Sequence, residues 1–115
     1  MLDVEQLSLV EPAFLITIVV ESVLKESIVV LLKKLKVKSY TVSAIQGEGR
    51  YTKRLNSASE STEISQELSI ETNVEIKAIV SQELSNVILY ALKEQQREFA
   101  IFAYRQKVEA LVDEG

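Results

Sequence analysis

The sequence predicts an α+β fold in which a four-stranded antiparallel sheet carries two helices on one of its faces. Segments rich in β-branched residues are interspersed with two segments whose apolar residues recur at helical spacing. Their order along the chain is strand, helix, strand, then again strand, helix, strand, which is the split βαβ arrangement. A length of 115 residues suits one domain, and we expect that domain to span residues 1–115.

The first half of the chain begins with an expected N-terminal extension, residues 1–12, and a strand over residues 14–20, "FLITIVV". Ser22 is expected to cap the helix that follows. The helix has an apolar stripe made of Leu24, Ile28, Leu31, Leu32 and Leu35. A second strand is predicted over residues 39–45, where Tyr, Thr, Val and Ile suit a pleated surface.

The second half repeats this order. A third strand is predicted over residues 68–80, because apolar and polar residues alternate there and indicate one buried face. The buried residues are expected to be Ile70, Thr72, Val74, Ile76 and Ala78. Ser81 or a neighbour should start the second helix, and the last strand should lie within residues 99–112. The stripe of the second helix consists of Leu84, Val87, Ile88, Ala91 and Leu92.

Between the second and third strands lies a polar, serine-rich segment, residues 48–67, which we expect to be a functional loop because of its length. Two of the three glycines, Gly47 and Gly49, stand at its base, and cations follow them. The glycines suit a turn with positive φ, or a backbone that closely approaches phosphate. The cations Arg50, Lys53 and Arg54, next to Tyr51, suit a solvated charge run, a phosphate site or an anchor for an acidic partner.

Composition excludes several classes of function. A net charge of −4 opposes coating a nucleic-acid backbone, so no nucleic-acid partner is expected. The chain has no cysteine and no histidine, which removes thiolate metal sites and the commonest general base. Glu71 and Glu75 are four residues apart on a predicted strand, which does not suit one catalytic centre. We expect no enzyme, no catalytic residues and no metal site.

The apolar run of residues 13–20 is too short to span a bilayer, and an acidic segment precedes it instead of the basic flank of a secretory signal. We therefore expect a cytoplasmic protein that reaches a membrane only through a partner. Two helices cover only one face of the sheet, while "FLITIVV" supplies apolar residues to both faces. Oligomerisation is the simplest way to cover the second face.

The segments "FLITIVVES", "KSYTVSAIQGEGR", "VEIKAIVSQELSNVILYALKEQ" and "AIFAYRQKVEAL", with the long polar loop between the second and third, resemble the PII-like signalling family. The similarity covers residues from about 13 to 112 and is greatest to the PII-like regulators associated with bicarbonate transport. It implies a ferredoxin-like βαββαβ fold and a homotrimer with effectors in the clefts between subunits. It also implies that residues 48–67 correspond to the T-loop, which docks on a partner such as a membrane transporter.

The resemblance implies roles for individual residues. Nucleotide binding would involve Gly47, Gly49, Arg50, Lys93 and Arg97, and the partner-binding loop would use Tyr51, Lys53 and Arg54. No tightly bound cofactor is expected. The implied ligands are ATP, ADP, AMP or cyclic AMP, and bicarbonate is a further candidate effector.

One stretch departs from the family pattern. Family members have a glycine-containing loop around the phosphates before the last strand, whereas this chain has "KEQQREFAIF" there. Lys93 and Arg97 either replace the missing backbone donors by charge or stabilise the negative end of the helix dipole. The alternatives are therefore a degenerate PII-like trimer that docks a partner without nucleotide, and a CutA-like cation-binding trimer with the same general fold.

Overall fold

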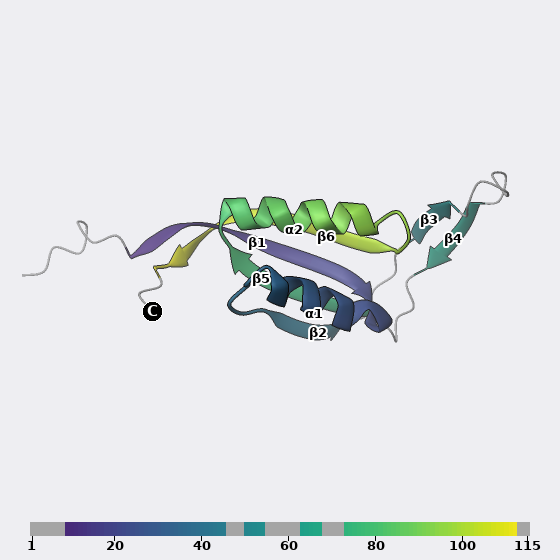
Figure 1. Ribbon diagram of the computed structural model, residues 1–115, viewed down its shortest axis with the longest axis horizontal. Coiled ribbons are helices and arrows are strands. Elements are labelled where there is room, and N and C mark those ends of the chain that lie inside the picture. Colours follow the sequence, from purple (N-terminus) through teal and green to yellow (C-terminus); the bar gives the residue numbers. More distant parts are fainter. Residues whose placement is uncertain (1–8, 46–49, 55–62, 68–72, 113–115) are drawn as a thin grey trace, which may run out of the picture.

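The computed structural model describes residues 9–45, 50–54, 63–67 and 73–112, with the backbone alone for 50–54 and 63–67. Its main elements are β1 (Val10–Glu21), α1 (Lys25–Lys34), β2 (Thr41–Ile45), β5 (Asn73–Val80), α2 (Gln82–Gln95) and β6 (Ile101–Leu111). They form a four-stranded antiparallel sheet with the order β2-β5-β1-β6. Both helices lie on one face of this sheet (Figure 1). The predicted fold class is confirmed.

The core lies between the helices and the sheet. On β5, Val74, Ile76 and Ala78 are buried, as their alternation predicts. The full core cluster consists of Ile16, Ile18, Val20, Ile28, Leu32, Val37, Val74, Ile76, Ala78, Val80, Ile88, Leu92 and Ile101. On α2 the expected stripe is wrong at one position: Val87 is 48% exposed, whereas the side chain of Ser85 is fully buried. A serine thus occupies a core-facing position of this helix.

The two helices begin differently. The Ser81 side chain accepts a hydrogen bond from the Leu84 backbone N–H at 3.2 Å, which confirms the predicted cap of α2. The prediction that Ser22 caps α1 was wrong. A 3₁₀ turn, Ser22–Leu24, precedes α1, and no side chain of the described residues caps the first turn of that helix. The chain enters α1 through this tighter turn, so Ser22 is the first residue of the turn and lies too early in the chain to cap α1.

Two strands begin at other residues than predicted, and the predicted start of a third lies outside the described residues. β1 begins at Val10 and therefore takes in the end of the expected extension, residues 1–12. Its early residues pair with β6 alone, from Val10 opposite Leu111, while pairing with β5 starts at Phe14. β5 begins at Asn73, and residues 68–72 lie outside the described part of the chain. β2 begins at Thr41, two residues later than predicted.

The expectation of a long loop over residues 48–67 was wrong in part, because the segment contains β3 (Arg50–Arg54) and β4 (Glu63–Glu67). These strands form a separate antiparallel pair, with Arg50 opposite Glu67 and Arg54 opposite Glu63. The pair lies beyond the end of the main sheet at which α2 ends (Figure 1). Sequence pattern missed it because polar residues dominate both strands, so no alternation of apolar and polar residues reveals the period of two.

No helix of the described residues covers the other face of the sheet (Figure 1), which carries apolar side chains together with polar ones such as Thr41, Glu75 and Lys77. Leu15 and Val19 of β1 are half-buried there, and Ile79, which is opposite Leu15, is 56% exposed. Phe102 and Tyr104 of β6 lie on the same face with their ring centroids 5.7 Å apart. This arrangement confirms that β1 presents apolar side chains to both faces. Among the described residues, no helix is long and apolar enough to cross a membrane.

Candidate ligand sites at the end of the second helix and on the open sheet

The predicted site residues differ in how far the structure describes them. Gly47 and Gly49 lie outside the described residues. Arg50, Tyr51, Lys53 and Arg54 all lie on β3, where the backbone alone is described. Lys93 and Arg97 lie at the end of α2 and in the turn that follows it. The described side chains therefore bring together only part of the predicted set.

Lys93 and Arg97 have separate surroundings. Lys93 Nζ donates a long hydrogen bond of 3.5 Å to Gln96 Oε1, and Gln96 Nε2 donates to the Ile101 backbone carbonyl at 3.0 Å. The Arg97 guanidinium lies 3.7 Å from the Glu94 carboxylate, with a side chain that is 77% exposed. Lys93 thus belongs to a small network that joins α2 to β6, and Arg97 belongs to an exposed ion pair.

Three backbone N–H groups of the turn from α2 to β6 bind carbonyls within the chain. The N–H of Gln96 binds the Leu92 carbonyl at 2.9 Å, and those of Glu98 and Phe99 bind the Gln95 carbonyl at 3.0 and 3.1 Å. A phosphate held by backbone N–H groups would need donors that point outward. This turn offers the side chains of Lys93 and Gln96 in their place.

A groove of about 510 Å³ runs between α2 and β6 and includes Lys93. Its floor is apolar and contains Leu92 and Ile101, which are both buried. Polar and aromatic groups surround this floor: Asn86, Tyr90, Lys93 and Gln96. An ammonium group and two amides above an apolar floor suit a ligand that joins anionic or carbonyl oxygens to an apolar or aromatic body.

Arg105 binds Asn86, which lines this groove, and sequence reasoning missed this arginine. Its Nη1 donates to Ser85 Oγ at 2.7 Å and to Asn86 Oδ1 at 2.5 Å, and its guanidinium lies 4.8 Å from the centre of the Phe14 ring. Arg105 therefore holds β6, α2 and β1 together and fixes Asn86 at the groove. A lone arginine on a polar strand gives no such signal in the sequence.

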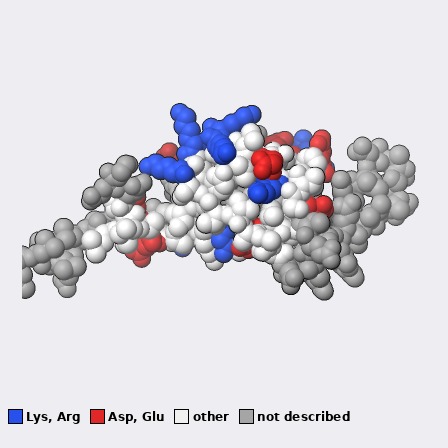
Figure 2. Space-filling view, turned by 90° about the horizontal axis from the view of Figure 1, so that it is seen from below, with Lys and Arg blue, Asp and Glu red and all other residues white. Residues whose placement is uncertain are grey.

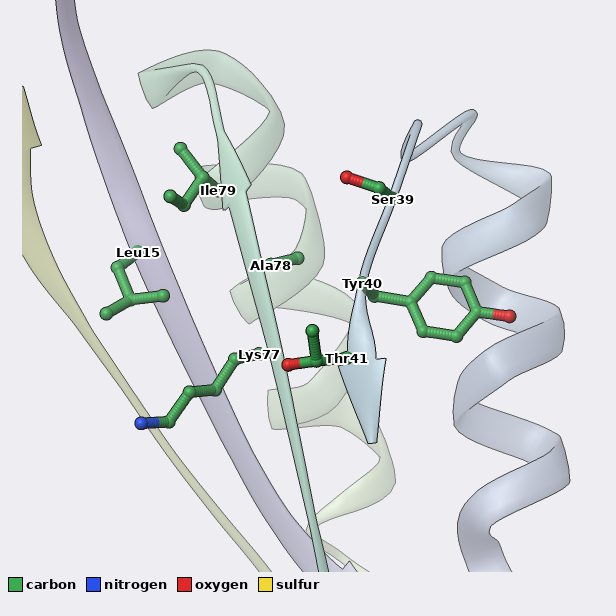
Figure 3. Close-up of a pocket in the computed structure, with 7 residues that line it drawn as sticks. All are labelled: Leu15, Ser39, Tyr40, Thr41, Lys77, Ala78 and Ile79. Atoms are coloured by element: carbon green, nitrogen blue, oxygen red, sulfur yellow. The ribbon is translucent and has the colours of Figure 1, made fainter. Parts of the chain in front are cut away.

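A second pocket, of about 320 Å³, lies on the open face beside the start of β2. Figure 3 shows Leu15, Lys77 and Ile79 on one side of the sheet, whereas Tyr40 and Ala78 point to the helix side. The hydroxyls of Ser39 and Thr41 stand at its margin (Figure 3). Lys77 Nζ lies 3.5 Å from Glu75 Oε1, so its charge is compensated. Neither Lys93 nor Arg97, the predicted site residues with described side chains, lines this pocket.

The fold is that of a small α+β protein with both helices on one face of its sheet and grooves beside α2 and on the other face. The family model for nitrogen regulatory protein P-II matches residues 13–111, and the chain belongs to this family. It is a PII-like regulatory protein. A search of curated proteins found no match.

Solved structures agree with this assignment. A PII-like signalling protein from Thermus thermophilus, TTHA0516, has 28% identity and a TM-score of 0.68 over 90% of this chain and 94% of that one. CPII from Thiomonas intermedia K12, bound to ADP, AMP and bicarbonate, has 18% identity and a TM-score of 0.66 over 90% and 98%. The GlnK–ATP complex from B. subtilis has 20% identity and a TM-score of 0.51 over 83% and 82%.

Proposed function

We propose that this chain is a non-enzymatic regulator that binds an adenine nucleotide, with bicarbonate as a second candidate effector, in clefts between the subunits of a homotrimer. The observation that carries the proposal is the P-II family match over residues 13–111. CPII, a structure of the same fold, is bound to ADP, AMP and bicarbonate, and GlnK of B. subtilis forms a complex with ATP. ATP, ADP, AMP and cyclic AMP are therefore the ligands to test.

The open sheet face supports the proposed assembly. Ile79, Phe102 and Tyr104 are 56%, 48% and 41% exposed there. Covering this apolar area with other subunits would remove it from water. The gain in free energy of assembly would be roughly 25 cal/mol for each Å² of apolar surface buried. The pocket beside Leu15 and Ile79 opens on the same face, so a neighbouring subunit would complete its walls.

The β3–β4 pair is the proposed partner-binding element, because it lies apart from the main sheet and carries Tyr51, Lys53 and Arg54. A transporter in a membrane is the partner we propose, and it would bring a cytoplasmic regulator to the membrane surface. Controlling a partner in this way would require the effector to change how β3 and β4 are presented.

The second candidate function is a trimer that docks its partner without nucleotide. The turn after α2 favours it, because the N–H groups of Gln96, Glu98 and Phe99 are all used within the chain. The decisive experiment is calorimetry of the folded protein with ATP, ADP, AMP and cyclic AMP, each with and without bicarbonate. Heat of binding that saturates with any of them supports the regulator. Flat titrations with a trimer in light scattering overturn nucleotide sensing and leave the docking protein.

A further inference from the structure

Four lysines crowd the end of α1. Lys33, Lys34, Lys36 and Lys38, here called the lysine cluster, are all exposed, although the chain as a whole has a net charge of −4. Figure 2 shows Lys and Arg side chains gathered together at the edge of the molecule that carries α1. Within residues 9–45 and 73–112, no ion pair joins Lys33, Lys34 or Lys36 to an acid.

Helix electrostatics account for only half of the cluster. Lys33 and Lys34 lie in the last turn of α1, where a cation stabilises the negative end of the helix dipole. Lys36 and Lys38 come after the helix has ended. The helix dipole therefore does not explain why Lys36 carries a cation.

Lys36 stands where the backbone favours another residue. Its φ is 63°, the left-handed region, and it is the one non-glycine residue with positive φ among those described. Lys36 N–H binds the Lys33 carbonyl and Val37 N–H binds the Leu32 carbonyl, both at 3.0 Å. These two bonds form a Schellman motif, in which glycine usually occupies the position of Lys36. With lysine at this position the fold is less stable than it would be with glycine. We therefore look for a function of the lysine side chain.

A pocket of about 340 Å³ adjoins the cluster, and Lys36 and Lys38 both line it. Apolar side chains from three other elements, Pro12, Leu84 and Leu111, form much of the rest. Glu11 is the acidic residue in its lining. Cations thus stand beside a recess that suits an apolar side chain.

We infer that the lysine cluster and this pocket together bind an acidic peptide segment of a partner protein. Carboxylates of the segment would pair with the ammonium groups of Lys33, Lys34 and Lys36, and an apolar side chain between them would enter the pocket beside Leu84 and Leu111. A net charge of −4 opposes a nucleic-acid backbone, and a lipid surface would leave the recess unfilled. The site lies at the end of the domain away from β3 and β4 (Figure 1), so it serves a second partner.

The test uses a fluorescein-labelled synthetic peptide with one leucine flanked on each side by three glutamates. Fluorescence anisotropy measures the affinity of this peptide for the full chain. Lys36→Gly should weaken binding about two- to fivefold, the range for one exposed ion pair, while raising the melting temperature because glycine adopts the left-handed conformation readily. Lys36→Gln tests the charge alone and should weaken binding by a similar factor. Lys25→Gln, at the other end of α1, is the matched control and should leave binding unchanged.

A peptide with serine in place of leucine should bind more weakly than the leucine peptide, because it leaves the pocket unfilled. If wild type and Lys36→Gly bind the leucine peptide with equal affinity, while the melting temperature rises as expected, Lys36 is only a solvated cation. That result would overturn the inference. Failure of the peptide to bind, together with Lys36-dependent sedimentation on phosphatidylserine vesicles, would assign the surface to a membrane and overturn it as well.

Discussion

The Arg105 guanidinium donates a 2.7 Å hydrogen bond to the hydroxyl of Ser85, a side chain that is fully buried in α2. Ser85 Oγ in turn donates to the Gln82 carbonyl at 2.8 Å. The hydroxyl is thereby satisfied twice, which explains how a serine occupies a core-facing position of the helix. Because Arg105 comes from β6, this contact fixes the edge strand to the helix that borders the α2–β6 groove.

Arg105→Gln should lower the free energy of unfolding by about 1.5–3 kcal/mol, the range for a hydrogen bond to a charged group. Loss of the contact with Phe14 would contribute to the same effect, since the cation lies over the ring. Urea denaturation measures the change. Lys107→Gln, an exposed cation on the same strand, is the control and should change stability by less than about 0.5 kcal/mol. Equal effects of the two substitutions would show that the Arg105 contacts contribute nothing specific.

Thr17 lies in the centre of the open sheet face and is 1% exposed, yet its hydroxyl oxygen has no hydrogen-bond partner among the described residues. A buried polar atom without a partner costs about 1–3 kcal/mol. Valine has the same branched shape and suits a strand. Thr17→Val should therefore raise the free energy of unfolding by about 1–3 kcal/mol, measured by urea denaturation.

Thr41→Val is the control for this effect, because Thr41 is an exposed threonine on the same face. It should change stability by less than about 0.5 kcal/mol. A Thr17→Val protein that is less stable than wild type would contradict the prediction and indicate that the hydroxyl finds a partner in the assembled protein.

The proposed trimer predicts different effects for two equally exposed apolar residues. Phe102 on the open face and Val87 on the outer side of α2 are each 48% exposed. Phe102→Glu would place a charge in an apolar subunit interface without a partner, so it should convert the trimer to monomers in light scattering. Val87→Glu should leave the trimer intact. If both variants still form trimers, the open face is not the interface between the subunits.

Much of the fold follows from periodicity. The alternation of Val74, Ile76 and Ala78 predicts the buried face of β5 because a strand that is half buried sorts its residues by this period. The same reasoning does not predict that Ser85 of α2 is buried, because its burial depends on Arg105, which is 20 residues away in the sequence. Single residues that are compensated by distant partners leave no local pattern.

The candidate sites were harder to predict for a related reason. Lys93 does line a groove, where its ammonium group donates to the side chain of Gln96. The amide of Gln96 in turn binds the Ile101 carbonyl and fixes the turn. The lysine run at the end of α1 is visible in the sequence, whereas the left-handed backbone at Lys36 is visible only in the structure. Charge can be read along a chain, but backbone conformation depends on where each helix ends.

The last prediction concerns Arg50, which the family resemblance places at the phosphate side of the proposed nucleotide site. Arg50→Ala should weaken ATP binding by about 1.5–3 kcal/mol, or roughly 10- to 150-fold, because it removes a hydrogen bond to a charged group. Arg54→Ala, at the other end of β3, is the control and should bind ATP as wild type does. Calorimetry gives both affinities.

The same measurement separates the nucleotide site from the proposed docking element. Arg54 and Glu63 are opposite each other in the β3–β4 pair, so replacing residues 55–62 with Asn-Gly should close the pair with a two-residue turn. The fold and the ATP affinity should both persist, because the change lies at the far end of β3 from Arg50 and Glu67. Loss of ATP binding in a folded Asn-Gly variant would show that the nucleotide site extends beyond Arg50 into the segment we assign to the partner.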